Sequence, residues 1–181
     1  MKAIPTAIPD VMVIDPTVFG DARGFFYESW NQKALDAAVG REVRFVQDNH
    51  SASVRGVLRG LHYQVKSAQG KLVRVTEGEV YDVAVDLRRS SPTFGRWVAE
   101  RLSEANRRML WVPEGFAHGF LVLSDRAQFL YKTTDYYAPE HERTLLWNDP
   151  KLAIPWPLEG APMLKPKDAA GTPLAQAETF A

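Results

Sequence analysis

Apolar and polar residues alternate with a period of two along much of the chain, a pattern typical of β-strands that bury one face. The clearest example is EVYDVAVDLR (79–88), in which Tyr81, Val83, Val85 and Leu87 share one face. The residues between them, two of which are aspartates, share the other face. This stretch therefore predicts a half-buried strand.

Similar short runs recur along the chain, each separated from the next by Gly, Pro, Asn, Asp or Ser, the residues that favour turns. They are KLVRV (71–75), RWVAERL (96–102), RMLWVP (108–113), GFLVL (119–123) and QFLYKTT (128–134). Short strands at even spacing are typical of a sandwich or barrel. We therefore expect an all-β fold.

Helical periodicity is confined to residues 31–39, where Asn31 can cap the first turn and Gly40 can take the left-handed conformation at the end. From residue 149 onward the chain is proline-rich, and we expect it to wrap the body without regular structure. A length of 181 residues is enough for one core, so residues 1–181 are expected to form a single domain.

The charge is balanced, with 22 basic and 22 acidic residues, which does not indicate a nucleic-acid-binding or membrane-binding surface. The absence of cysteine removes disulfides, thiolate metal sites and cysteine nucleophiles, and fits a reducing compartment. No apolar run is long enough for a membrane span, and prolines and Asp10 interrupt the N-terminal segment where a signal peptide needs apolar residues. We expect a cytoplasmic protein.

His62 lies in RGLHYQ (59–64), a stretch with strand character. A single strand histidine is often a hydrogen-bonded packing residue. Here, however, Arg59, Tyr63 and Lys71 are close in sequence, and so many polar groups would be costly in an apolar core. His62 is therefore a candidate functional residue.

The segment VPEGFAHGFLVL (112–123) resembles the second of the paired motifs of the cupin jelly rolls, and RGLHYQ lies where the first is expected. Pro113, Gly115 and His118 fall at P-x-G-x-x-H, where proline and glycine shape a hairpin entry and the histidine points into the barrel. The resemblance implies a cupin-type jelly-roll barrel with short peripheral helices and an irregular C-terminal tail.

Metal-binding cupins supply H-x-H and a following glutamate in the first motif. This chain has His62 and Gln64 in the H-x-H positions, with Ala68 and Gln69 near the place of the glutamate. Transition-metal sites of this kind normally assemble three or four imidazole and carboxylate ligands. We therefore predict no metal site, and a metal cupin that uses His62, Gln64 and His118 stays an alternative.

More specifically, the sequence resembles the dTDP-4-dehydrorhamnose 3,5-epimerase family. Its members are cupin enzymes that use no cofactor. The resemblance spans nearly the whole chain in similar order and spacing. The matching segments are FGDARGFFYESW (19–30), VQDNHS (46–51), GVLRGLHYQ (56–64), QGKLVRV (69–75), DVAVDLRRSSPTFGRW (82–97), VPEGFAHGF (112–120), YKTTDYY (131–137) and WNDPKLAIPW (147–156).

The resemblance implies conversion of dTDP-4-dehydro-6-deoxy-D-glucose to dTDP-4-dehydro-L-rhamnose. The protons on C3 and C5, both α to the C4 ketone, are removed and returned on the opposite faces, which needs a base, an acid and enolate stabilisation. The family pattern assigns His62 as the base, Asp168 as the carboxylate that orients its imidazole, and Tyr131 as the acid. It places Lys71 in the same pocket, where an ammonium group would stabilise the enolate.

The resemblance also implies a set of substrate-binding residues. They are Arg23, Phe25, Glu28, Gln47, Asn49, Arg59, Lys71, His118, Tyr137, Glu142 and Lys167. Arg23 and Arg59, with Lys167, would bind the diphosphate because cations form strong hydrogen bonds with phosphate oxygens. Tyr137 would stack on the thymine. At position 165, where the family usually has serine, this chain has a lysine.

One feature of the first motif conflicts with this assignment. Strict alternation puts Arg59 and His62 on opposite faces of one strand, although both are assigned to the same site. Gly60 lies between them and could introduce a bulge that resets the alternation.

The family forms homodimers in which N-terminal strands pair across subunits, so residues before about position 30 are expected to serve the neighbour's pocket. Two further alternatives stay open on this scaffold. A relative could epimerise one carbon only or move the ketone between C3 and C4, although retention of His62 and Tyr131 favours the epimerases. A catalytically silent nucleotide-sugar-binding module would also fit a jelly roll, but it needs no base, orienting carboxylate and acid together.

Overall fold

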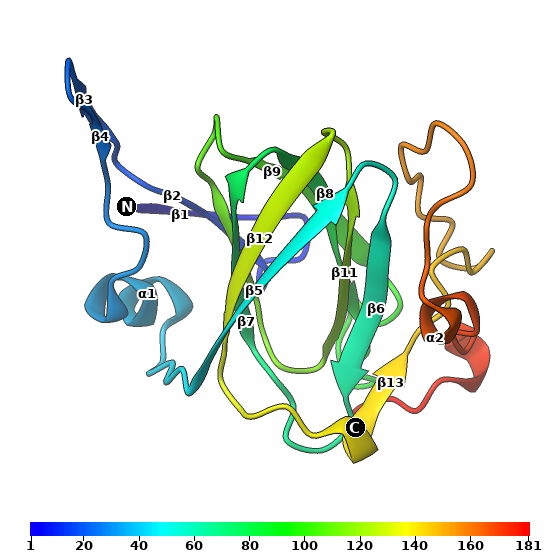
Figure 1. Cartoon of the computed structure of the whole chain (residues 1–181). Coiled ribbons are helices and arrows are strands. Elements are labelled where there is room, and N and C mark those ends of the chain that lie inside the picture. Colours follow the sequence, from blue (N-terminus) through cyan, green and yellow to red (C-terminus); the bar gives the residue numbers. More distant parts are fainter.

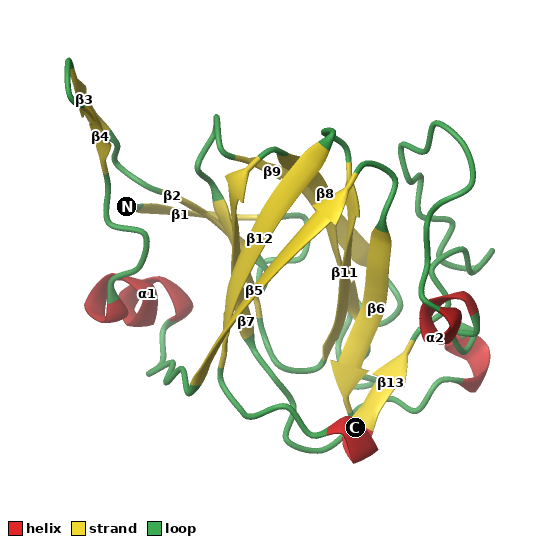
Figure 2. Cartoon of the chain, in the orientation of Figure 1, coloured by secondary structure: helices red, strands yellow, loops and turns green.

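Two antiparallel β-sheets face each other across the core of the computed structural model, which describes all residues 1–181 (Figures 1 and 2). The first sheet has six strands, in the order β1 (Lys2–Pro5), β2 (Met12–Asp15), β10 (Met109–Val112), β7 (Lys71–Glu77), β12 (Arg126–Thr133) and β5 (Gln47–Val54). The second has five, in the order β13 (Glu142–Thr144), β6 (Leu58–Gln64), β11 (Phe116–Val122), β8 (Glu79–Asp86) and β9 (Trp97–Ser103). The all-β prediction is confirmed, and every run predicted as a strand overlaps an observed strand, with ends that differ by a few residues.

The remaining elements lie outside the two sheets. They are the hairpin of β3 (Phe19–Asp21) and β4 (Gly24–Phe26), the helices α1 (Gln32–Val39) and α2 (Pro166–Ala169), and the short 3-10 helices η1 (Pro139–His141) and η2 (Leu174–Gln176). The caps predicted for α1 are confirmed, since Asn31 accepts a hydrogen bond from the Ala34 amide at 3.1 Å and Gly40 has a φ of 77°.

Strand β8 is buried on both faces, which corrects the prediction of a half-buried strand. Val80 and Ala84 pack into the core between the sheets. Val83 and Val85 pack on the outer side, in a cluster that includes residues of the C-terminal tail, such as Leu152. The sequence pattern could not show that the tail covers this face. The tail does wrap the body as predicted, although it contains two short helices (Figure 2).

Gly60 introduces a bulge between β6 and β11, as the resemblance required. His62 pairs with His118 and Arg59 with Phe120, so two residues of β6 lie opposite Gly119 alone. A β-carbon on Gly60 would lie 2.6 Å from the Gly119 Cα, and the φ of Gly60 is 126°, so a side chain is not tolerated there. The bulge resets the alternation and brings the side chains of Arg59 and His62 to one pocket.

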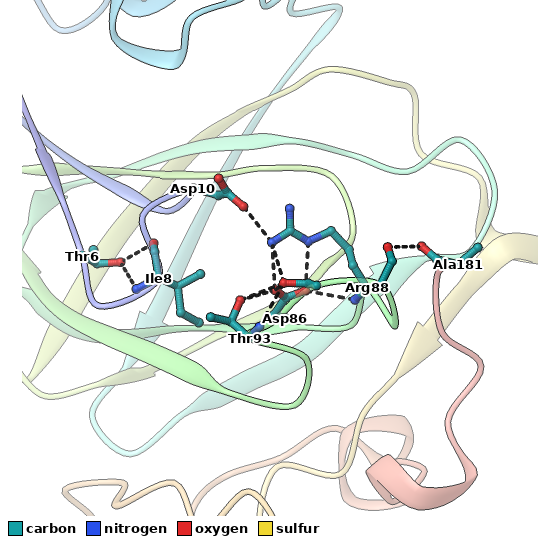
Figure 3. Close-up of polar contacts among 9 residues, drawn as sticks. Thr6, Ile8, Asp10, Asp86, Arg88, Thr93 and Ala181 are labelled. Carbon is teal, nitrogen blue, oxygen red and sulfur yellow. Dashed lines mark hydrogen bonds and ion pairs between the residues drawn. The ribbon is translucent and has the colours of Figure 1, made fainter.

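The C-terminal end of β8 carries a buried carboxylate, that of Asp86, which accepts hydrogen bonds from several donors (Figure 3). Asp86 accepts hydrogen bonds from the Arg88 backbone amide and guanidinium at 2.8–2.9 Å, and from the hydroxyls of Ser91 and Thr93 at 2.6 Å. Arg88 also forms an ion pair with Asp10 at 2.8 Å, which ties the N-terminal segment to β8. Burial alone would raise the pKa of Asp86, but the hydrogen bonds from Arg88, Ser91 and Thr93 outweigh it and lower the pKa to about 2.

This depressed pKa predicts a defined acid sensitivity. The folded-state pKa of Asp86 lies below the ordinary value of 3.8, so its stabilisation is present above about pH 4 and is lost as the pH falls toward about 2. Asp86→Asn should lower the free energy of unfolding at neutral pH by about 2 kcal/mol or more. Denaturant unfolding across this pH window should show the difference between wild type and variant shrinking as the pH falls. A constant difference would contradict the assignment.

No helix of the structure is long and apolar enough to cross a membrane.

Candidate active site

A cavity of about 320 Å³ lies between the two sheets and takes its walls from both. It is lined by Gln47, Asn49, Ser51, Arg59, His62, Gln69, Lys71, His118, Gly119, Phe120, Phe129, Tyr131, Tyr137, Glu142, Lys165, Lys167 and Asp168. All four predicted catalytic residues and most of the predicted binding residues are among them. A larger hollow of about 450 Å³ lies around Arg55 and Arg101, but it has no histidine or tyrosine in its lining.

His62 and Asp168 form a hydrogen-bonded pair although 106 positions separate them. His62 stands on β6, and α2 holds Asp168 so that its Oδ1 lies 2.6 Å from the His62 Nε2. The carboxylate is buried, whereas 24% of the His62 side chain is exposed. When the Nε2–H of a neutral imidazole donates its hydrogen bond to this carboxylate, the Nδ1 keeps a free lone pair. This is the arrangement of an oriented general base.

Tyr131 reaches the cavity from the opposite sheet. It stands on β12, whereas His62 stands on β6 of the second sheet. Burial raises the pKa of the Tyr131 hydroxyl, an effect that nearby Arg59 opposes. The phenol therefore keeps its proton at neutral pH and can donate it.

Lys71 is a buried cation within the same cavity. Its Nζ lies 3.5 Å from the His62 carbonyl oxygen. Burial lowers the pKa of Lys71 to about 8, while the negative charges of Asp82 and Glu142 act in the opposite direction. An ammonium group at this depth would strongly stabilise a developing negative charge.

A second pair, His118 and Asp82, lies deeper in the barrel. The His118 Nε2 lies 2.9 and 3.0 Å from the two carboxylate oxygens of Asp82. Both side chains are buried, and Asp82 is completely inaccessible. The sequence placed His118 in the binding site but did not assign it this partner.

Glu142 links two further predicted binding residues at the cavity. It accepts hydrogen bonds from the Lys167 ammonium at 2.8 Å and the Tyr137 hydroxyl at 3.1 Å. Burial acts to raise the pKa of Glu142, but the hydrogen bond from Lys167, the charge of Lys167 and the hydrogen bond from Tyr137 act to lower it, and the pKa lies below its ordinary value. Tyr137 is 52% exposed, so its ring is available to a ligand that enters the cavity.

The other predicted residues on the cavity wall are held by neighbouring groups. Gln47 donates to Asn49 at 2.9 Å and accepts from the Tyr137 amide at 3.1 Å. The Arg59 guanidinium donates to the Ser53 hydroxyl at 3.0 Å and to the Ala52 carbonyl at 3.3 Å.

Three predicted binding residues lie away from the cavity of the single chain: Arg23, Phe25 and Glu28. Arg23 and Phe25 belong to the β3–β4 hairpin, which projects from the body (Figure 1). Arg23 pairs with Asp21 at the hairpin, and its side chain is 91% exposed. Glu28 accepts a hydrogen bond from Asn31 at 3.1 Å.

Sequence reasoning missed several cavity residues, among them Ser51, Gln69 and Lys165 as binding groups. Gln47 and Asn49 stand at alternate positions of β5, so the same alternation would have pointed to Ser51. β5 itself was not predicted, because its sequence QDNHSASV lacks alternating apolar residues. Lys165 was noted only as a departure from the family pattern.

The residues of the metal-cupin alternative do not converge as ligands. The Nε2 atoms of His62 and His118 are each hydrogen-bonded to an aspartate. The Gln64 amide donates to the carbonyls of Ser67 and Tyr136 and is absent from the cavity lining. No group of three or more His, Cys, Asp or Glu side chains is arranged to hold a metal ion.

The comparisons with known proteins all point to the same family. The family model described as dTDP-4-dehydrorhamnose 3,5-epimerase matches residues 5–176. A dTDP-4-dehydrorhamnose 3,5-epimerase of Pseudomonas aeruginosa is 66% identical over 180 residues, which cover 99% of each chain. A crystal structure of dTDP-6-deoxy-D-glucose-3,5-epimerase from Legionella pneumophila, in complex with dTDP-4-keto-L-rhamnose, is 54% identical with a TM-score of 0.95 and covers 98% of this chain and 94% of that one.

A second solved structure, dTDP-4-dehydrorhamnose 3,5-epimerase from Bacillus anthracis with TDP and PPi bound, is 47% identical with a TM-score of 0.91, covering 95% of this chain and 98% of that one. These structural similarities confirm the predicted cupin-type fold. The matches extend over nearly the whole chain at high identity, and the chain therefore belongs to the dTDP-4-dehydrorhamnose 3,5-epimerase family.

Proposed function

We propose that this cavity inverts C3 and C5 of dTDP-4-dehydro-6-deoxy-D-glucose through the residues described above. One observation carries the assignment of roles: the oriented base His62 and the protonated phenol of Tyr131 enter one cavity from facing sheets. Inversion of a carbon requires proton removal on one face and proton delivery on the other. A sugar ring bound between the two sheets would meet a base on one side and an acid on the other.

Each inversion then proceeds in two proton transfers. The His62 Nδ1 takes the proton from the carbon α to the ketone, and the C–H electron pair moves into the enolate. The ammonium of Lys71 stabilises the enolate oxygen, and Asp168 stabilises the imidazolium that forms. Tyr131 gives its proton to the opposite face of the carbon. The imidazolium returns its proton to solvent and the phenolate regains one, so the site is restored.

The cavity also has groups suited to the nucleotide half of the substrate. Arg59, Lys165 and Lys167 supply cations for a diphosphate, and the exposed ring of Tyr137 is available for stacking on a base. Bound ligands in relatives support this proposal, since the Legionella structure contains dTDP-4-keto-L-rhamnose and the Bacillus structure contains TDP and PPi.

Product formation provides the test of this function. Purified protein incubated with dTDP-4-dehydro-6-deoxy-D-glucose should generate dTDP-4-dehydro-L-rhamnose. The conversion can be monitored by proton NMR of the sugar. A reductase that accepts only the L-rhamno product should consume it as it forms. Recovery of unchanged substrate would contradict the proposed function.

We further propose that the protein is a homodimer in which the β3–β4 hairpin of each subunit reaches the cavity of the other. Phe19, Phe25 and Phe26 on this hairpin are 63%, 62% and 67% exposed, an apolar surface that is costly to leave in water. The same hairpin carries Arg23, the predicted diphosphate ligand that is remote from its own cavity. A second copy of the chain would cover the aromatic rings, and its cavity would receive Arg23 as a ligand for the diphosphate.

Complementation between two inactive variants tests the shared site. In a heterodimer of Arg23→Ala and His62→Asn subunits, the cavity of the Arg23→Ala subunit keeps its His62 and receives an intact hairpin from its partner. We expect such a heterodimer, purified with two different tags, to recover about half of the activity of the wild-type dimer, because one of two sites is complete. If each hairpin served its own cavity, both sites would be defective and no activity would return.

A further inference from the structure

Residues 135–138, which include Tyr137, form a segment without regular structure at the cavity. The segment lies between β12 and η1 and belongs to no helix or strand. No backbone–backbone hydrogen bond involves residues 135–137. A segment without such bonds keeps a single conformation only if other groups bind its backbone, because ordering each residue costs conformational entropy.

Gln64 binds this segment at two points. It stands at the end of β6, two positions after His62, and is only 4% exposed. Its side-chain amide donates to the Tyr136 carbonyl at 3.2 Å and accepts from the Ala138 backbone amide at 2.9 Å. A further bond, to the Ser67 carbonyl at 2.7 Å, uses its other donor. The whole amide is therefore engaged, and a buried amide is costly to separate from its partners.

Two further glutamines bind the rest of the segment. Gln69 donates to the Asp135 carbonyl at 2.9 Å, and Gln47 accepts from the Tyr137 amide at 3.1 Å. Together with Gln64, they bind the backbone of every residue in the segment. Gln47 and Gln69 line the cavity, whereas Gln64 does not. Gln64 can therefore influence a ligand only through the residues that it holds.

The side chain of Tyr137 is also held at its hydroxyl end. The hydroxyl donates to the Glu142 carboxylate at 3.1 Å, and the same carboxylate binds the Lys167 ammonium at 2.8 Å. Tyr137 is nevertheless 52% exposed and lines the cavity. An aromatic ring that is held at both ends and open to the cavity is preorganised for stacking, because little conformational freedom is lost when a base binds.

We propose that Gln64 is a positioning residue of the nucleotide site, whose amide fixes residues 135–138 and so places the Tyr137 ring before the base of a nucleoside diphosphate sugar arrives. The proposal rests on the proposed function, which gives Tyr137 the role of stacking on the base. Gln64 takes no part in proton transfer. Its loss should therefore weaken nucleotide binding and leave the chemical step intact.

Hydrogen exchange of the wild-type protein tests whether the segment is ordered without a ligand. The backbone amides of Tyr137 and Ala138 both donate to glutamine side chains. In the absence of nucleotide they should already exchange far more slowly than the amides of an unstructured chain. Exchange at the rate of an unstructured chain, with protection gained only on addition of thymidine diphosphate (TDP), would overturn the proposal without any variant.

Gln64→Met removes both donors and the acceptor but keeps a side chain of similar length. We expect calorimetry to give a Kd for TDP that is about 3–10-fold weaker, because the segment must then be ordered when the ligand binds. KM should rise to a similar extent, with kcat within about two-fold of wild type. The matched control is Gln128→Met on β12, since Gln128 hydrogen-bonds His50 and Glu77 and is absent from the cavity lining. This control should bind TDP as the wild type does.

A double-mutant cycle tests whether Gln64 acts through Tyr137. Tyr137→Ala should weaken TDP binding by about 5–150-fold, the range for loss of a stacking ring. Gln64→Met should add little in that background. Inorganic pyrophosphate, which has no base, should bind Gln64→Met as tightly as the wild type.

Three results would each overturn the proposal: wild-type TDP affinity in Gln64→Met, losses of TDP affinity that add in full, or an equal loss of pyrophosphate affinity. A wild-type protein that binds no TDP would refute the nucleotide site of the proposed function and this proposal with it. The expected binding pattern in a protein without turnover would support the role of Gln64 and refute the epimerase function alone.

Discussion

His62→Asn is expected to lose deuterium exchange at both C3 and C5 while it keeps its fold. Every inversion begins with proton removal by the His62 Nδ1, and the side chain of asparagine has no basic nitrogen to replace it. Loss of a general base typically costs about 10²–10⁴-fold in rate. Exchange should be followed by NMR of dTDP-4-dehydro-6-deoxy-D-glucose in deuterated water, with each carbon observed separately.

His50→Asn is the matched control for this substitution. His50 stands on β5, where it hydrogen-bonds Gln128 at 2.7 Å, and it is absent from the cavity lining. This variant should therefore exchange at the wild-type rate. Near-normal exchange in a folded His62→Asn protein would remove His62 from the mechanism.

Tyr131→Phe is expected to separate exchange from epimerisation. The ring still packs and His62 still forms the enolate, but the proton for the opposite face is missing. His62 then returns a solvent-derived proton to the face from which it took the first. Deuterium should therefore enter C3 or C5 with retained configuration, while product formation falls by about 10²–10⁴-fold, the usual range for loss of a general acid.

Tyr63→Phe provides the control for loss of a buried hydroxyl. Tyr63 is adjacent to His62 in sequence but donates to the Glu178 carbonyl at 2.8 Å, on the side of β6 that packs against the tail. Its substitution should leave product formation intact in the folded protein. Full product formation in Tyr131→Phe would exclude Tyr131 as the acid. Equal loss of exchange and product would mean that the hydroxyl helps to form the enolate.

The sequence predicted local structure well at positions where the residue type itself dictates the backbone conformation, such as a helix cap or a glycine. Asn31 and Gly40 marked the ends of α1, and Gly60 marked the bulge in β6. The alternation along β8 predicted a strand but not its environment, because burial of the outer face depends on a tail far away in sequence. Strand β5 went unpredicted since its residues are mostly polar.

The candidate site was predictable only in part, for a related reason. Hydrogen-bond partners far apart in the chain cannot be paired from spacing, and the contact between His62 and Asp168 was expected only through the resemblance. The contact between His118 and Asp82 spans 36 positions and was not expected at all. Both contacts depend on the packing of strands and tail, which brings His62, His118 and Asp168 to the lining of one cavity.

The hairpin of β3 and β4 illustrates a different limit. Arg23 was assigned to the substrate from the family pattern, yet in the single chain it lies on a projecting hairpin and pairs with Asp21 (Figure 1). Its proposed place in a neighbouring cavity depends on a second copy of the chain, so neither the sequence nor one subunit can position it.

The most direct test of the central claim is carbon-resolved labelling by the wild-type enzyme. Protein and dTDP-4-dehydro-6-deoxy-D-glucose are mixed in deuterated water, and the product is trapped by a reductase to prevent reversal. Removal and opposite-face return of both protons predicts one deuterium at C3 and one at C5, each on an inverted carbon. Deuterium at one carbon only would indicate a single-carbon epimerase, and inverted product without deuterium at either carbon would contradict the proposed proton transfers.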